Sequence, residues 1–187
     1  EAQKNQIMGR LESLRNTCDT VRRDLHSLES RRKVLLDMEA TMEGYSHSVK
    51  AVMKACHDDK EFGRGIHGAL AQLITVREAY EVAIEVCLGG ALQNIITDDE
   101  YAAKRAIEYL KRHNLGRATF LPVSSVKPRT LEPEILSQVR SMPGFEGIAS
   151  DMVSCDGRFK GIILNLLGRT VIVDNMDSAI QMARRFS

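Results

Sequence analysis

The chain has 187 residues, 43% of them hydrophobic, and its 26 basic and 25 acidic side chains leave a formal net charge of +1. This hydrophobic content is enough for a folded core and argues against a disordered tail, and the balanced charge means that any nucleic-acid surface has to come from an uneven distribution of basic residues. No stretch approaches the roughly 20 apolar residues that cross a bilayer, and the N-terminus EAQKNQIMGR has no apolar signal core, so we expect a cytoplasmic protein with no membrane contact.

Residues 1–42 carry a heptad pattern, with apolar residues in steps of four and three from Ile7 to Leu35 and charged residues between them. A narrow apolar stripe on a charged helix is typical of a coiled coil. A helix of about 38 residues would be roughly 57 Å long, too long to pack wholly against a small domain. We therefore expect a coiled-coil arm over 1–42 that ends before Gly44. An amphipathic helix folded onto the rest of the protein is the alternative.

Residues 43–123 alternate between strand-like and helical patterns, which predicts a first lobe of mixed α/β structure. We expect strands at 67–76, 94–97 and 117–123, and helices at 77–88 and from Asp98 or Asp99 to Arg112. The expected core faces of the two helices are Ala79, Val82, Ala83 and Val86 for the first, and Ala103, Ile107 and Leu110 for the second.

All four prolines fall between Pro122 and Pro143, which predicts a linker over 124–143 with at most a short helix at 134–141. A second lobe follows over 144–187, with a helix in GIILNLLG, a strand at 170–174 and a capped helix in NMDSAIQMARRF. Leu167-Gly168 and Asp174 match Leu88-Gly89 and Asp98 of the first lobe, which has three extra residues. We therefore expect a two-lobed body with an internal repeat. Chance similarity is the alternative, because helix, strand, helix is a common order.

The segment EFGRGIHGAL has Gly63, Gly65 and Gly68 at the G-x-G-x-x-G spacing of dinucleotide-binding folds. Such a site needs a buried strand before the first glycine and a helix N-terminus after the last. Here the polar segment MKACHDDKEF precedes the motif and the strand-like ALAQLITV follows it. A small α/β nucleotide-binding enzyme that uses Gly63–Gly68 therefore remains only as the alternative function.

No other motif indicates catalysis, a cofactor or a metal site. Cys56, His57, Asp58 and Asp59 are reactive types, but adjacent side chains point apart and cannot converge on one metal or form a nucleophile and base pair. The four cysteines are scattered, and we expect them to be reduced and mostly buried.

Basic residues cluster in both lobes, and such clusters can bind phosphates without reading sequence. The members in the first lobe are Lys104, Arg105, Lys111, Arg112, His113 and Arg117, and those in the second are Arg158, Lys160, Arg169, Arg184 and Arg185. An ordinary solvated helix face is an equal alternative in the first lobe, because Glu100 and Glu108 lie on the same helix.

Three segments together carry a family resemblance: GIHGALAQLITV, YEVAIEVCLGGALQNIITDDEYAAKRAIEYLKRHNLGRATFLPV and FKGIILNLLGRTVIVDNMDSA. They closely resemble the hinge domain of SMC (structural maintenance of chromosomes) proteins, most like the bacterial chromosome-condensation type. The resemblance covers about residues 42–187, and the heptad helix is similar to the last part of the incoming arm.

The resemblance implies an α+β, two-lobed hinge that forms a homodimer through sheet edges, the first lobe of one protomer meeting the second lobe of the other. It implies a nucleoid-associated role in chromosome condensation and segregation. The hinge itself would be non-catalytic and without a cofactor, because ATP and Mg²⁺ belong to distant ATPase heads. A closing strand and a returning arm helix would follow Ser187, and a chain lacking them is expected to dimerise less well or to self-associate through its lone helix.

The resemblance also implies site residues. Six glycines are expected to allow close packing at or near the dimer seam: Gly65, Gly68, Gly89, Gly90, Gly161 and Gly168. The sequence does not tell which of them contact the partner. Double- or single-stranded DNA is expected to bind without sequence preference through five basic residues: Lys104, Arg105, Lys111, Arg112 and Arg117.

Overall fold

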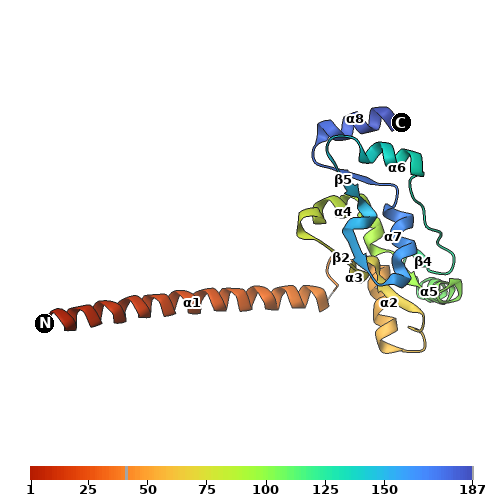
Figure 1. Ribbon diagram of the computed structural model, residues 1–187. Coiled ribbons are helices and arrows are strands. Elements are labelled where there is room, and N and C mark those ends of the chain that lie inside the picture. The colour runs from red at the N-terminus through yellow and green to blue at the C-terminus, as the bar shows by residue number, and fades with distance from the viewer. Residues whose placement is uncertain (41, 187) are drawn as a thin grey trace. The chain divides into compact units, whose positions relative to one another are not determined.

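The computed structural model describes residues 1–40 and 42–186, which divide into two compact units, Glu1–Gly44 and Tyr45–Ser187. The first unit is essentially one continuous helix, α1 (Ala2–Ala40) (Figure 1). The apolar heptad residues between Ile7 and Leu35 are 52–65% exposed, as an unpaired coiled-coil strand requires. The predicted end of this helix at residue 42 is wrong, since Met42 lies in a turn with a φ of 50°; Thr41 lies outside the described residues.

The second unit consists of two lobes joined by an extended linker. The first lobe contains α2 (His47–Asp58), β1 (Ile66–Ala69), α3 (Leu70–Leu73), β2 (Ile74–Val76), η1 (Glu78–Tyr80), α4 (Glu81–Leu88), η2 (Gly89–Gln93), β3 (Ile95–Thr97), α5 (Glu100–Arg112) and β4 (Phe120–Pro122). The second contains α6 (Pro133–Arg140), β5 (Phe145–Ile148), η3 (Ala149–Met152), β6 (Val153–Cys155), η4 (Gly157–Phe159), α7 (Lys160–Leu167), β7 (Val171–Val173) and α8 (Met176–Phe186). The mixed fold predicted from the sequence is confirmed.

Polar side chains set the start of three helices. The Ser46 side chain caps α2, and Asp99 Oδ1 accepts a hydrogen bond from the backbone N–H of Ala102 (2.8 Å) at the start of α5. Asn175 Oδ1 accepts one from Ser178 N–H (2.9 Å) before α8. Each cap satisfies a backbone donor that the first helical turn leaves unpaired, so local sequence fixes these boundaries.

Three small sheets organise the lobes. In the first lobe β3 is central, antiparallel to β1 and parallel to β4; in the second, β5 pairs antiparallel with β7. Strands β2 and β6 pair antiparallel across the lobes. The equivalent strands β2 and β6 thus pair with each other, which relates the two lobes by an approximate two-fold.

The internal repeat is regular. Every element from β1 to α4 recurs 79 residues later, from Gly65 to Gly144 at the start and from Gly89 to Gly168 at the end. Both copies have a register shift beside a glycine of positive φ, Gly68 in β1 and Gly147 in β5. The predicted repeat is therefore confirmed, and it begins earlier than the sequence matches indicated.

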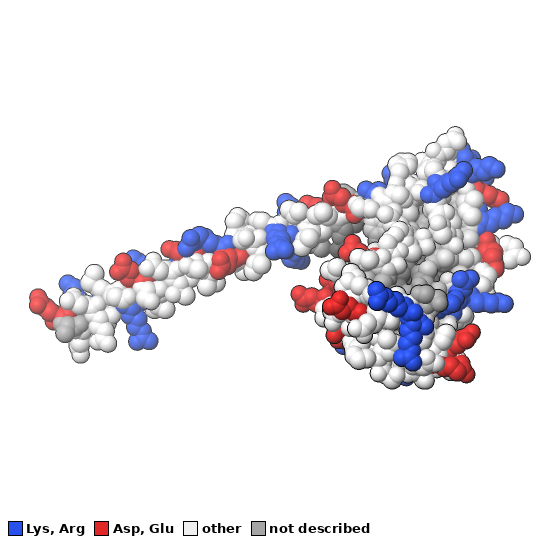
Figure 2. All heavy atoms as spheres, turned by 90° about the horizontal axis from the view of Figure 1, so that it is seen from above, with Lys and Arg blue, Asp and Glu red and all other residues white. Residues whose placement is uncertain are grey.

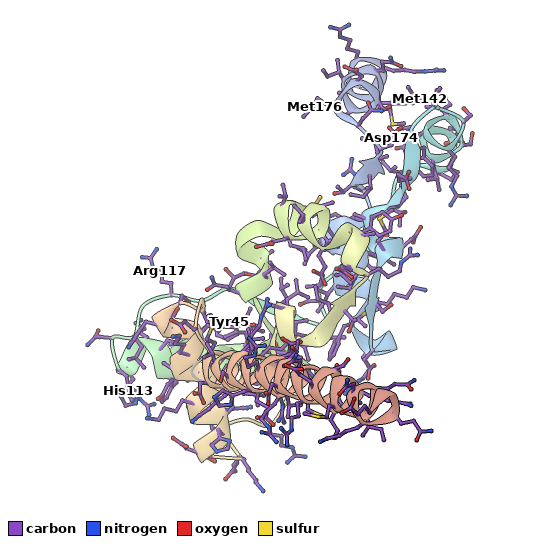
Figure 3. The ribbon with its side chains drawn as sticks, turned by 90° about the vertical axis from the view of Figure 1, so that its left-hand side faces the viewer. Tyr45, His113, Arg117, Met142, Asp174 and Met176 are labelled. Atoms are coloured by element: carbon purple, nitrogen blue, oxygen red, sulfur yellow. The ribbon has the colours of Figure 1, made fainter. Side chains whose placement is uncertain are left out.

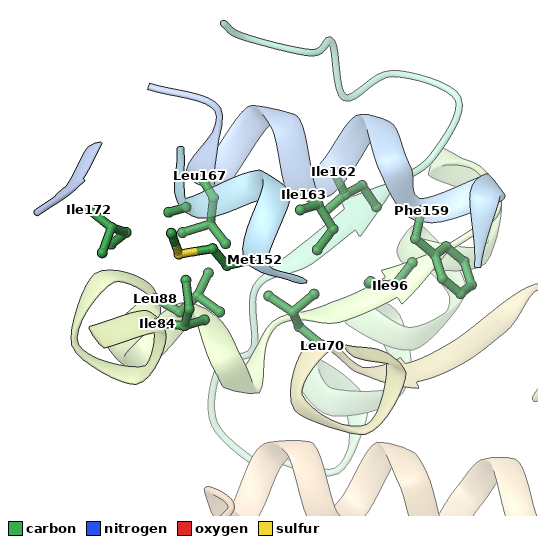
Figure 4. Close-up of a cluster of buried hydrophobic side chains, with 11 residues drawn as sticks. Leu70, Ile84, Leu88, Ile96, Met152, Phe159, Ile162, Ile163, Leu167 and Ile172 are labelled. Carbon is green, nitrogen blue, oxygen red and sulfur yellow. The ribbon is translucent and has the colours of Figure 1, made fainter. Parts of the chain in front are cut away.

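The main hydrophobic core is shared by the two lobes (Figure 4). The first lobe contributes Leu70, Ile84, Leu88 and Ile96, and the second contributes Ala149, Met152, Phe159, Ile162, Ile163, Leu167 and Ile172. Because each lobe buries its apolar face against the other, the lobes form one folding unit through this core.

Several predicted elements are wrong in detail. The strand expected at 67–76 is interrupted by the helical turn α3, which buries Leu70 and lets its N–H donate to the carbonyl of Asn94 (2.8 Å). The strand expected at 117–123 is limited to Phe120–Pro122.

Two predicted core faces are wrong in part. On α4, Val82 and Val86 are 74% and 76% exposed while Ile84 and Leu88 are buried, because α4 packs against α7 through its larger side chains. On α5 the prediction is confirmed for Ala103 and Leu110, which are buried, but Ile107 is half exposed, and the small residues Ala102 and Ala106 are buried as well.

The cysteines are free thiols, but two of them, Cys18 and Cys87, are exposed, so the expectation that most are buried is wrong. Burial raises the pKa of the partly buried Cys56 thiol to about 11.

Candidate functional site

The glycine segment 63–68 serves the fold of the first lobe. The N–H of Gly63 donates to Asp59 O (3.0 Å), and Asp59 Oδ1 accepts from the N–H groups of Glu61 (2.8 Å) and Phe62 (3.1 Å). Backbone donors that a pyrophosphate would need are therefore used within the loop. The helix after Gly68 is a four-residue turn, so the loop lacks the long helix N-terminus of a dinucleotide site.

Gly65 and its repeat equivalent Gly144 have a structural role in their own lobes. Their φ angles are 78° and 79°, which favour glycine. A Cβ on Gly65 would lie 3.3 Å from Asp98 Oδ2, and one on Gly144 would collide with the Asp174 and Ser178 side chains. Each glycine carbonyl accepts a hydrogen bond from the N–H of the aspartate that follows the partner strand.

The six glycines expected near a dimer seam lie in three environments. Gly65 and Gly68 belong to the β1 region, and Gly161 and Gly168 lie under the linker, where a Cβ on Gly168 would collide with the carbonyl oxygen of Arg129. Gly89 and Gly90 lie on the surface, with no heavy atom within 4 Å of an added Cβ. Which glycines contact a partner stays a prediction.

Arg105 is engaged by its own lobe. Its Nε donates to the carbonyl of Phe62 (3.1 Å) and a terminal nitrogen donates to the carbonyl of Arg64, so the guanidinium holds the loop that leads into β1. Lys104 lies in the open, with its Nζ 3.9 Å from Glu108 Oε1 on the next turn. An exposed pair of this kind contributes little to stability.

Lys111, Arg112 and Arg117 are exposed at the C-terminal end of α5 and in the loop after it. Figure 3 shows His113 and Arg117 in this region and Met142, Asp174 and Met176 at the far end of the second lobe. The loop is anchored, because the Ser48 hydroxyl donates to the carbonyl of Arg117 (2.6 Å). On the face that Figure 2 shows, Lys and Arg side chains of the second unit form several separate groups with acidic ones nearby.

An aromatic contact of His67 joins the lobes beside the shared core, and a polar contact within the first lobe orients its ring. His67 Nε2 lies 2.6 Å from Asp98 Oδ1, and the His67 ring packs edge-on against Phe159 of the second lobe at 5.1 Å. Near it, Arg158 donates to Asp156 through both its side chain and its backbone N–H, and this lowers the pKa of Asp156. The packing of the His67 ring on Phe159 fixes the position of η4 against β1.

The second lobe has an apolar groove of about 310 Å³ between α6, β7 and α8. It is lined by Leu131, Ile135, Val139, Arg169, Val171, Val173, Ala179, Met182, Ala183 and Phe186. No single stretch of the sequence predicts this groove, because its walls come from three separate segments.

Residues 1–40 and 42–186 contain no group of three or more His, Cys, Asp or Glu side chains placed to hold a metal ion. In the same part of the chain, no helix is both long enough and apolar enough to cross a membrane.

A family model described as SMC proteins Flexible Hinge Domain matches residues 63–183, which span both lobes. The chain belongs to the SMC hinge family. Proteins named Chromosome partition protein Smc are similar to it: the one from Desulfitobacterium hafniense (strain Y51) is 39% identical over 162 residues, and the one from Bacillus subtilis (strain 168) is 38% identical over 155. These alignments cover 87% and 83% of the chain, which spans only 13% of the length of either relative.

Solved SMC hinge structures have the same fold. An asymmetric dimer of the Geobacillus stearothermophilus SMC hinge domain matches with a TM-score of 0.80 at 38% identity, over 85% of this chain and 62% of that one. The Pyrococcus furiosus SMC hinge domain matches with a TM-score of 0.53 at 36% identity, over 71% and 73% of the two chains. The mixed fold, the long N-terminal helix and the membership of the SMC hinge family predicted from the sequence are therefore confirmed.

Proposed function

We propose that this chain is the homodimerising hinge of a chromosome condensation and segregation protein. The observation that carries the proposal is the family match across both lobes together with the solved asymmetric dimer of a 38% identical hinge. The strand edges support it, since in the described residues β1 pairs only with β3 and β5 only with β7. An open edge presents unpaired backbone groups to another strand.

The test is sedimentation equilibrium of the chain extended through a return helix. A dimer is expected at micromolar concentration, and a monomer at every concentration would contradict the proposal. An increase in melting temperature with NAD or ATP would instead favour the nucleotide-binding alternative, because a ligand stabilises the state that binds it.

In this proposal α1 is the incoming arm. Its exposed heptad stripe packs against a returning helix of the same longer polypeptide, and the groove beside β7 receives the closing strand that precedes that helix. The hinge is non-catalytic and without a cofactor, and ATP and Mg²⁺ are used by heads elsewhere in the longer protein. The protein works in the cytoplasm on the nucleoid.

We also propose that the hinge binds double- or single-stranded DNA without sequence preference. Lys104, Lys111, Arg112 and Arg117 are the candidates that the geometry favours, because each is exposed on or next to α5. Arg105 is the weaker candidate, since its guanidinium already donates to two carbonyls. Such contacts weaken steeply with salt, because phosphate binding releases counterions.

A further inference from the structure

Helices α4 and α7 occupy equivalent places in the two lobes. Both have eight residues, both follow a 3-10 turn and both are followed by a glycine. The constant spacing of the repeat makes Val82 equivalent to Gly161, Val86 to Asn165 and Gly89 to Gly168. In each copy these positions are related as i, i+4 and i+7, so they share one side of the helix.

In the second lobe this side of α7 is covered by residues 126–129 of the linker, which we call the crossing segment. A Cβ on Gly161 would lie 3.8 Å from the carbonyl oxygen of Val126, and Asn165 Nδ2 donates to the carbonyl of Lys127 (2.7 Å). Gly168 lies directly under the carbonyl of Arg129. All three positions therefore contact the backbone of one extended segment.

The same side of α4 is apolar and exposed. Val82 and Val86 are 74% and 76% exposed, and a Cβ on Gly89 would meet nothing within 4 Å. Two valines replace the glycine and the asparagine of α7, so this side of α4 is more apolar than the side that the crossing segment covers. A segment that covered the two valines would remove this apolar area from water, which is favourable.

The order of elements along the chain indicates which segment covers this side of α4. The crossing segment follows β4, and β4 follows α5 and pairs with the edge of β3 opposite β1. Helix α8 is the equivalent of α5. Among the described residues β7, the equivalent of β3, pairs only with β5, and its Val171 and Val173 line the apolar groove. The approximate two-fold exchanges α5 with α8 and α7 with α4. When the same operation is applied to β4 and the crossing segment, it places a segment downstream of α8 across α4.

We propose that the side of α4 formed by Val82, Val86 and Gly89 is the docking surface for an extended segment of the same polypeptide that lies downstream of α8. This segment crosses α4 as residues 126–129 cross α7, with its backbone against Gly89 and apolar side chains against the two valines. The proposal rests on the proposed function, in which this hinge belongs to a longer chain that returns to the arm. The docked segment holds the two lobes together from the second side.

Thiol labelling tests the surface. In a Cys87→Ser background, Val86→Cys is treated with a maleimide in residues 1–187 and in the longer polypeptide that includes the return helix, and the modified site is located by mass spectrometry. We expect labelling of Val86→Cys to be at least about tenfold slower in the longer polypeptide, because a covered thiol reacts only after local opening. The control is Tyr101→Cys in the same background, since Tyr101 is 79% exposed on α5 and should react equally in both.

A second measurement uses the double variant Val82→Gln with Val86→Gln. Glutamine is a good helix former, so the melting temperature of residues 1–187 should stay the same, whereas that of the longer polypeptide should fall by roughly 5 °C or more. Equal labelling and equal melting in the two chains would overturn the proposal. Protection in residues 1–187 that rises with concentration would assign the surface to a second copy and overturn it too. Sedimentation equilibrium of the same samples shows independently whether the longer polypeptide forms a dimer. A failure of the proposed dimerisation can therefore be told apart from a failure of the docking surface.

Discussion

The two lobes share the repeated elements, from β1 to α5 in the first and from β5 to α8 in the second, but differ in what covers them. In the first lobe, β4 lies along β3 and the outer side of α4 is exposed; in the second, Val171 and Val173 of β7 line an apolar groove and the crossing segment covers α7. The shared core keeps the equivalent helices and strands alike, because each must fit the same packed centre. The outer surfaces are free of that constraint, so this is where the lobes carry different contacts.

The largest expected effect comes from the glycines after the equivalent helices. Gly168→Ala should destabilise the protein by more than about 3 kcal/mol in urea unfolding, because its Cβ would collide with the backbone oxygens of Arg129 and Leu164. Gly90→Ala, in the open surface after α4, is the matched control and should change stability by less than about 0.5 kcal/mol. Similar losses at both sites would show that the linker does not fix the second lobe.

Helix α4 allows a comparison within one element. Ile84→Ala should cost about 2–4 kcal/mol, since Ile84 is 2% exposed in the shared core and its removal leaves a cavity. Val86→Ala in residues 1–187 should cost less than about 0.5 kcal/mol, because Val86 is 76% exposed. If urea unfolding gave the reverse order, the rotation of α4 described above would be wrong.

DNA binding should distinguish the basic groups of the two lobes. Lys111→Glu with Arg112→Glu is expected to lower affinity roughly tenfold at low salt, equally for unrelated sequences, and to reduce the slope of affinity against salt. The matched variant Arg184→Glu with Arg185→Glu changes two exposed arginines at the end of α8. The DNA affinity of both variants is measured by fluorescence anisotropy. Undiminished DNA binding by the variant with Lys111→Glu and Arg112→Glu would show that the end of α5 is not part of the DNA surface.

The smallest expected effect is electrostatic and should be alike in both lobes. Hydrogen bonds with Arg158 lower the pKa of Asp156, and hydrogen bonds from the Glu100 backbone and from Ser124 lower the pKa of Glu100. A carboxylate with a lowered folded pKa adds stability above its unfolded pKa, near 4, and loses it as pH falls through the folded value. Asp156→Asn and Glu100→Gln should each slightly reduce the decrease in the free energy of unfolding between pH 6 and pH 3, measured by urea unfolding. An unchanged pH dependence of the free energy of unfolding would mean that these exposed hydrogen bonds do not persist in solution.

Much of the fold could be predicted because its signals are local. The heptad stripe of α1, the caps at Asp99 and Asn175 and the buried strand β3 each follow from a few neighbouring residues. The candidate sites could be predicted less well. Arg105 looks like a phosphate ligand in sequence, yet it holds carbonyls more than 40 residues away.

The sequence by itself determined the heptad helix, the two capped helices and the strand between residues 94 and 97, because helix periodicity and capping act over a few residues at a time. It also indicated the repeat and, through its resemblance to SMC hinges, the family. Tertiary structure decided which side of α4 is buried, how residues 67–76 divide around Leu70 and which glycines lie against their own chain. On α4 either Val82 with Val86 or Ile84 with Leu88 could have been the core face. Ile84 and Leu88 are the buried pair because α7, almost 80 residues further along the chain, packs against them. Which side of a helix is buried thus depends on partners that are distant in the sequence.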